Sequence, residues 1–211
     1  MTGNGYYTLK QNATAEIVDR KSVFIGYARP VGQEDEALAF IKEIRARHAD
    51  ASHNVYAYAL REGNHTRFSD DGEPHGTAGL PVLEVLRKEL LTDCVVVITR
   101  YFGGTLLGTG GLVRAYSAAA KSALNAAGRV FLKPFTLLTI QTDYGRYQRV
   151  SRLMADFKVK TRNARFTEDV TIEAAVDAER RDTFIAELKD ATNDCVVMSV
   201  GGVVYDYEEN E

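Results

Sequence analysis

The sequence predicts an α+β chain of two domains, residues 1–133 and 134–211. Strand and helix periods occur together throughout the chain. The composition, 45% hydrophobic and 26% charged, is that of a globular protein. After Lys133-Pro134, the periods follow the order β-α-β-β-α-β. This order is the split βαβ, or ferredoxin-like, pattern.

The first domain is predicted to combine strands with three helices. The strands are expected at residues 13–18, 22–31, 53–61 and 94–101, and the helices at residues 34–49, 80–91 and 110–127. In the first helix, Ala37, Ile41, Ile44 and His48 recur on one face. The last strand is almost continuously apolar and β-branched, which is typical of a central strand.

The second domain is predicted to contain four strands and two helices. The strands are expected at residues 135–142, 158–166, 170–176 and 195–207, and the helices at residues 145–157 and 179–191. A group of seven cations follows the first of these strands: Arg146, Arg149, Arg152, Lys158, Lys160, Arg162 and Arg165. Such a group is typical of a phosphate-binding surface or of ordinary solvated faces, and the sequence leaves both interpretations open.

Charge and hydropathy exclude several classes of protein. The formal net charge is −3, with +2 in residues 1–133 and −5 in residues 134–211, so the whole chain is not a basic nucleic-acid wrapper. No apolar run reaches the roughly 18 residues that a membrane span needs, so no membrane partner is expected. Residues 1–10 are polar and Tyr-rich and lack the core of a signal peptide, which predicts a cytoplasmic protein. The sequence does not indicate an oligomeric state.

Two cysteines are too few for a disulfide framework or a four-cysteine zinc site. Cys94 and Cys195 each open an apolar, strand-like run. We therefore expect two buried free thiols. We expect no metal site and no cofactor.

A glycine-rich segment between a strand and a helix is the densest functional signal. Its expected binding residues are Arg100, Gly103, Gly104, Gly108, Gly110, Gly111, Arg114 and Lys121. Glycines there let backbone N–H groups approach an anion at the start of the helix. An arginine in the first turns of a helix opposes the helix dipole unless an anion neutralises it. The segment lacks the Lys-Ser/Thr of a P-loop, and Val113 occupies the position of the third dinucleotide glycine. A phosphate, such as that of an RNA backbone, is one ligand that fits these residues. The alternative is that the glycines only allow the helix to pack closely on the sheet.

An acidic loop precedes this segment and allows two other interpretations. It contains Asp70, Asp71, Gly72, Glu73, Pro74, His75, Gly76 and Thr77. Its carboxylates could form an internal salt bridge with Arg114. Alternatively, Asp70, Asp71, Glu73 and His75 could serve a small metal-dependent hydrolase of phosphate esters or peptides. Against a hydrolase, Asp-Gly and Glu-Pro are turn residues.

The same two segments resemble a known family. The stretches SDDGEPHGTAGLPVLEVL (69–86) and VVVITRYFGGTLLGTGGLVRAYS (95–117) are similar to the signature stretches of the IMPACT/YigZ family. The resemblance implies a first domain like those of a small-subunit ribosomal protein and elongation factors, a two-layer β3-α-β-α fold. It implies a second domain like the fifth domain of elongation factor G. Eukaryotic members regulate translation by binding the activator of a starvation-responsive kinase.

These observations together predict a non-catalytic, translation-related regulator. Its expected partners are RNA, the ribosome or a translation-regulatory protein, which it would bind through the glycine-rich loop and a basic surface. Resemblance of fold does not by itself establish a function.

Overall fold

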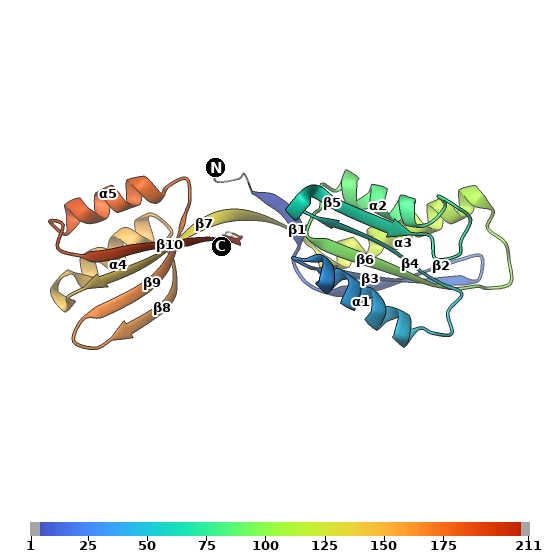
Figure 1. Cartoon of the computed structure of the whole chain (residues 1–211), viewed down its shortest axis with the longest axis horizontal. Helices are drawn as coiled ribbons and strands as arrows, with labels where there is room; N and C mark the ends of the chain where they lie inside the picture. The colour runs from blue at the N-terminus through green and yellow to red at the C-terminus, as the bar shows by residue number, and fades with distance from the viewer. Residues whose placement is uncertain (1–4, 208–211) are drawn as a thin grey trace. The chain divides into compact units, whose positions relative to one another are not determined.

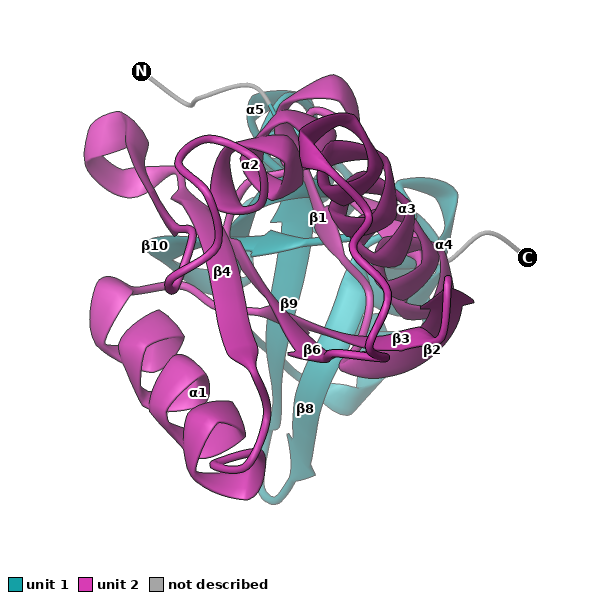
Figure 2. Ribbon diagram, turned by 90° about the vertical axis from the view of Figure 1, so that its right-hand side faces the viewer, with its two compact units in different colours: residues 1–5, 132–211 teal, residues 6–131 magenta. Residues whose placement is uncertain are grey.

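The computed structural model describes residues 5–207 and divides into two compact units. One unit contains residues 6–131, and the other contains residues from 132 onward together with Gly5 (Figures 1 and 2). The predicted α+β class is confirmed. Residues 1–4 and 208–211 lie outside the described residues. Residues 1–4 belong to the N-terminal segment that lacks the core of a signal peptide.

The unit of residues 6–131 is built on a five-stranded antiparallel sheet. Its strands, in spatial order, are β2 (Ala13–Asp19), β3 (Ser22–Pro30), β6 (Cys94–Tyr101), β4 (His53–Leu60) and β5 (His65–Ser69). The central strand β6 has the predicted bounds, and all of its residues before Tyr101 are buried. Because apolar groups cover both faces of β6, helices can pack on both sides of the sheet.

Three helices occupy the two faces of this sheet (Figure 2). They are α1 (Glu34–Arg47), α2 (Gly79–Lys88) and α3 (Thr109–Ala127). Helices α2 and α3 share one apolar core with the sheet, and α1 forms a second core on the opposite face. Gly26 lets the Ala-rich helix α3 approach β3 closely, since a Cβ there would lie 2.9 Å from the backbone oxygen of Ala119.

Two short elements of this unit are not predicted from the sequence. Strand β5 follows a 3-10 turn, η1 (Glu62–Asn64), and consists mainly of polar residues without a strand-like alternation. Strand β1 (Tyr6–Leu9) has only four residues and belongs to the other sheet, where it pairs with β7.

The second sheet has the predicted split βαβ order. Its elements are β7 (Arg129–Thr142), α4 (Tyr144–Asp156), β8 (Lys160–Phe166), β9 (Val170–Asp177), α5 (Arg181–Ala191) and β10 (Val197–Asp206). The strands β10, β7, β9 and β8 lie side by side and antiparallel. One apolar core joins this sheet to α4 and α5.

Strand β7 begins earlier than the sequence predicts, at Arg129 instead of residue 135. Pro134 interrupts the strand pattern in the sequence, yet its carbonyl accepts a hydrogen bond from the Ala178 N–H at 3.0 Å, and it pairs with Tyr205. A proline removes only a donor, so a strand can continue through it. The division into domains after residue 133 remains a prediction, and that boundary lies inside this strand.

The two cysteines differ. Cys94 is buried at the start of β6, as predicted, and burial raises the pKa of its thiol well above the ordinary value. The expectation of a buried Cys195 is wrong, because this residue is exposed in the turn before β10. Its Sγ lies 3.3 Å from the Asn193 carbonyl oxygen. Within residues 5–207, none of the helices combines the length and apolarity that a membrane crossing requires.

A thiol reagent should therefore separate the two cysteines. We expect Cys195 to react with an aromatic disulfide within seconds to minutes in the native protein, and Cys94 only after unfolding, because thiolate formation and access control the rate. Mass spectrometry after a timed reaction would locate the label. The variant Cys195→Ser should show no fast phase; rapid labelling of Cys94 in that variant would contradict the buried position.

Candidate functional site

The acidic loop between β5 and α2 uses its first carboxylate to start a helix. Asp70 accepts hydrogen bonds from the backbone N–H groups of Gly76 (2.8 Å), Ala78 (3.2 Å) and Gly79 (2.8 Å). The N-cap residue of α2, Ala78, has no side-chain cap of its own. Asp70 therefore satisfies donors that the first turn of a helix leaves without partners.

The second carboxylate ties the loop to neighbouring elements. Asp71 has a φ of 46°, and its carboxylate accepts hydrogen bonds from the Asn54 N–H at 2.6 Å and from Arg45 at 2.5 Å. Its carbonyl oxygen lies 2.8 Å from His53 Nδ1. Thr77 closes the loop by donating its hydroxyl to the Pro74 carbonyl at 2.6 Å. These contacts hold the loop against β4 and α1.

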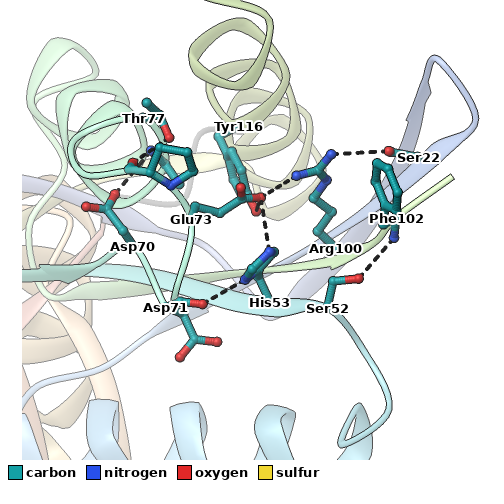
Figure 3. Close-up of polar contacts among 12 residues, drawn as sticks. Ser22, Ser52, His53, Asp70, Asp71, Glu73, Thr77, Arg100, Phe102 and Tyr116 are labelled. Atoms are coloured by element: carbon teal, nitrogen blue, oxygen red, sulfur yellow. Dashed lines mark hydrogen bonds and ion pairs between the residues drawn. The ribbon is translucent and has the colours of Figure 1, made fainter. Parts of the chain in front are cut away.

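The third carboxylate, Glu73, is buried in an ion pair (Figure 3). Its Oε1 accepts hydrogen bonds from Arg100 Nη1 at 2.6 Å and from Tyr116 Oη at 2.7 Å. The side chains of Glu73 and Arg100 are only 4% and 7% exposed. Burial and the neighbouring carboxylate raise the pKa of the Tyr116 phenol far above its ordinary value, so this phenol remains a donor.

Arg100 also connects the ion pair to the glycine-rich turn. Its Nη2 lies 3.4 Å from Ser22 Oγ, and the same oxygen accepts a hydrogen bond from the Gly103 N–H at 3.2 Å. Gly103 packs tightly here, since a Cβ would lie 2.0 Å from the Lys21 carbonyl carbon. The preceding N–H, that of Phe102, donates to Ser52 Oγ at 3.2 Å. The base of the turn is thus held at two consecutive residues.

A second polar cluster fixes the end of β6 on the opposite face of the sheet. His48 Nε2 lies 2.6 Å from Tyr27 Oη, and its Nδ1 lies 2.9 Å from Tyr101 Oη. Tyr101 in turn donates to Asp50 at 3.1 Å. Burial, followed by the nearby Arg47 charge, lowers the pKa of His48 below its ordinary value. The folded protein therefore favours neutral His48.

Beyond this fixed base, the tip of the turn is exposed to solvent. Gly104 and Gly108 have φ values of 80° and 72°, which favour glycine. Gly108 precedes α3 and offers no side-chain cap, so the first N–H groups of the helix have no acceptor from an N-cap side chain. Arg114 is exposed, and within residues 5–207 it has no ion-pair or hydrogen-bond partner. Residues 94–142 contain neither Asp nor Glu.

The predicted binding residues separate into internal and exposed groups. Arg100 is committed to Glu73, Lys121 forms an ion pair with Glu89, and Gly103 packs against Lys21. A Cβ at Gly111 would lie 2.9 Å from that of Leu107, so this glycine also serves packing. The exposed residues of the predicted set are Gly104, Gly108, Gly110 and Arg114. The internal salt bridge expected for Arg114 is made by Arg100 instead.

The arrangement gives no support to the hydrolase alternative. Asp70, Asp71 and Glu73 each accept two or more hydrogen bonds from the protein itself, which commits these carboxylates to holding the loop and its neighbours in place. The side chain of His75 is fully exposed to solvent, and its Nδ1 lies 3.7 Å from Asp70 Oδ2. Among the described residues, no group of three or more potential metal ligands is present.

The seven cations of the second domain are partly used within the structure. Arg146 pairs with Asp143, Arg165 with Glu173 and Lys160 with Asp206, while Arg149 donates to the Ala191 carbonyl. These contacts favour the interpretation of solvated helix and strand faces.

Several residues of the site could not be recognised from the sequence. Ser22, Ser52 and His53 are isolated polar residues in the sequence. They meet at one end of the sheet because β3 and β4 both pair with β6 there, and because Ser52 and Ser22 bond to Arg100 and Gly103. Tyr116 has a clearer signal: it lies two residues after Arg114 in the glycine-rich segment, on an apolar helix face. Its phenol needs a partner when buried.

Comparisons with known proteins identify the family of this chain. Residues 20–124 match the Impact N-terminal domain, and residues 140–194 match a domain of unknown function, DUF1949. The chain is 36% identical to the IMPACT family member YvyE of Bacillus subtilis over 203 residues, which is 96% of this chain and 94% of that protein. The chain belongs to the IMPACT family. The acidic loop and the glycine-rich turn both lie within the Impact N-terminal domain match.

Other IMPACT relatives show how far the similarity extends. YigZ of Escherichia coli is 35% identical over 174 residues, which cover 81% of this chain and 85% of that protein. Protein IMPACT of Rattus norvegicus is 34% identical over 99 residues, which cover 44% of this chain and 31% of that protein. A crystal structure of a hypothetical protein matches with a TM-score of 0.62 and 31% identity, over 93% of this chain and 97% of that one.

Removing Glu73 should destabilise the protein strongly. In Glu73→Leu, Arg100 remains buried without a counter-charge, which costs about 3–5 kcal/mol of unfolding free energy. Urea unfolding would measure this loss. Replacing both charges, in Glu73→Leu with Arg100→Met, should recover much of it. The control Glu84→Ala removes an exposed ion pair with Arg87 and should cost less than about 1 kcal/mol of unfolding free energy. An equal loss of unfolding free energy in Glu73→Leu and Glu84→Ala would refute the importance of the buried pair.

Stability should also decrease as the solution becomes acidic. Because the folded-state pKa of His48 is lowered, the unfolded chain takes up a proton first, as the pH falls through about 6.5. The free energy of unfolding should therefore decrease from about pH 7 to pH 5, and His48→Gln should decrease less. His75→Gln, at a fully exposed side chain, is the control. A pH dependence identical in wild type and His48→Gln would exclude this role for His48.

Proposed function

We propose that this IMPACT-family protein is a non-catalytic, translation-related regulator that binds RNA through the tip of its glycine-rich turn. The resemblance to eukaryotic translational regulators supports the broad role, and it supports action in the cytoplasm. The geometry supports a binding surface, since the carboxylates next to the turn are occupied in holding the fold.

The observation that carries the proposal is a group of uncompensated positive groups around the turn. Arg20 and Lys21 are exposed in the β2–β3 turn, and Arg20 Nη1 lies 3.4 Å from the Leu106 carbonyl oxygen. Gly103 packs on Lys21, which places these cations beside the exposed loop that leads into α3. Asp19, which precedes Arg20, offsets only part of their charge.

This surface fits the phosphates of a nucleic-acid backbone. The N–H groups at the start of α3 and the positive end of its dipole favour an anion. Guanidinium groups such as those of Arg20 and Arg114 bind phosphate oxygens in a bidentate manner. Arg114 is the sixth residue of α3 and therefore lies in its second turn, beyond the first turn in which the dipole acts most strongly, and its exposed guanidinium is available to a phosphate. A protein partner from the translation apparatus is the competing ligand class.

The variant Arg114→Ala should bind single-stranded RNA more weakly. If Arg114 neutralises one phosphate, the slope of log affinity against log salt should decrease in magnitude by about 0.7. The melting temperature should stay unchanged, since Arg114 has no partner among residues 5–207. Fluorescence anisotropy with a labelled oligouridine at several salt concentrations would measure the slope.

Arg152→Ala is the matched control, because Arg152 is also an exposed helical arginine and lies in the second unit. Its affinity and salt slope should equal those of the wild type. Equal slopes for Arg114→Ala and the wild type would exclude the phosphate contact, and absence of RNA binding by the wild type would favour a protein partner.

A further inference from the structure

The same turn exposes two large apolar side chains. Phe102 is 48% exposed and Leu106 is 81% exposed, although both lie in a short segment between buried elements. Singly exposed apolar residues are ordinary. An aromatic ring and a leucine on one short loop, next to exposed cations, form a more specific surface.

The backbone beneath Phe102 is firmly held. Its N–H donates to Ser52 (Figure 3), and the next N–H, that of Gly103, donates to Ser22. Phe102 directly follows β6, and the Arg100 guanidinium carbon is 5.6 Å from the centroid of its ring. The ring is therefore positioned in advance and would lose little conformational freedom on binding a ligand.

We propose that Phe102 is a stacking platform for an unpaired base of the RNA. This inference rests on the proposed function, and it specifies the substrate class as single-stranded RNA. A base attached to a phosphate backbone matches both parts of this surface, since the ring can stack on the flat base while Arg20, Lys21 and Arg114 face the phosphates. The faces of bases in a duplex are already stacked, so duplex RNA would contact only the cations.

The charge of the surroundings favours a base over an apolar protein segment. Residues 94–142 have no carboxylate, and Glu73 is neutralised by Arg100. Asp19 and Asp50, which also lie near the turn, offset only part of the charge of Arg20, Lys21 and Arg114. An apolar segment of a partner protein would gain no binding energy from the cations. A nucleotide uses the ring and the cations together.

Binding of a single-stranded oligouridine of about 12 nucleotides and of an RNA duplex of the same length tests this inference. Phe102→Ala should bind the single strand about tenfold more weakly, with an unchanged salt slope, because no charge is lost. Its affinity for the duplex should remain that of the wild type. Phe102→Tyr keeps an aromatic face and should restore single-strand binding.

Phe166→Ala removes a phenylalanine of similar exposure from β8 in the other unit and should not change either affinity. Melting curves would confirm that each variant folds. Wild-type binding with an unchanged Phe102→Ala affinity, or an equal loss on single strand and duplex, would overturn the stacking proposal alone. Absence of binding by the wild type would overturn the proposed function and this inference with it.

Discussion

The ion pair of Glu73 and Arg100 is the interaction on which the first unit depends. Two opposite charges lie almost wholly inside the protein, where either one alone would be strongly unfavourable. Tyr116 and Ser22 supply further hydrogen bonds, so the pair joins the acidic loop, β6, α3 and the start of β3. Such a pair adds little net stability compared with apolar residues of the same size. We regard its main role as positional: it allows one arrangement of these four elements.

This positional role explains why two conspicuous motifs occur in one domain. Asp70 starts α2, Asp71 fastens the loop to β4, and Glu73 fixes the arginine that leads to the glycine-rich turn. The acidic residues look catalytic in the sequence, because carboxylates near a histidine are typical of hydrolases. In the structure they accept hydrogen bonds from backbone and side-chain donors of their own chain. The acidic loop is thus the support of the turn, and the turn presents the exposed surface.

The sequence predicts the elements better than their contacts. The bounds of β6 and the apolar face of α1 follow from composition and period, because burial depends on local pattern. The partner of Glu73 could not be predicted in this way. Both faces of β6 are buried, so its residues do not alternate between apolar and polar, and the inward direction of Arg100 appears only through its register with Phe24 and His53. The predicted burial of Cys195 is wrong for a related reason, because this residue precedes an edge strand whose side chains are largely exposed.

The same distinction decides which charges can act at the surface. The net charge of −3 gives no sign of a positive region. A count of the cations near the glycines includes Arg100 and Lys121, which the fold neutralises with Glu73 and Glu89. Once these pairs are removed, the remaining cations at the turn are Arg20, Lys21 and Arg114. A carboxylate that neutralises a buried arginine is also unable to neutralise an exposed one. The internal network therefore determines which cations remain to act at the exposed tip, and these are Arg20, Lys21 and Arg114.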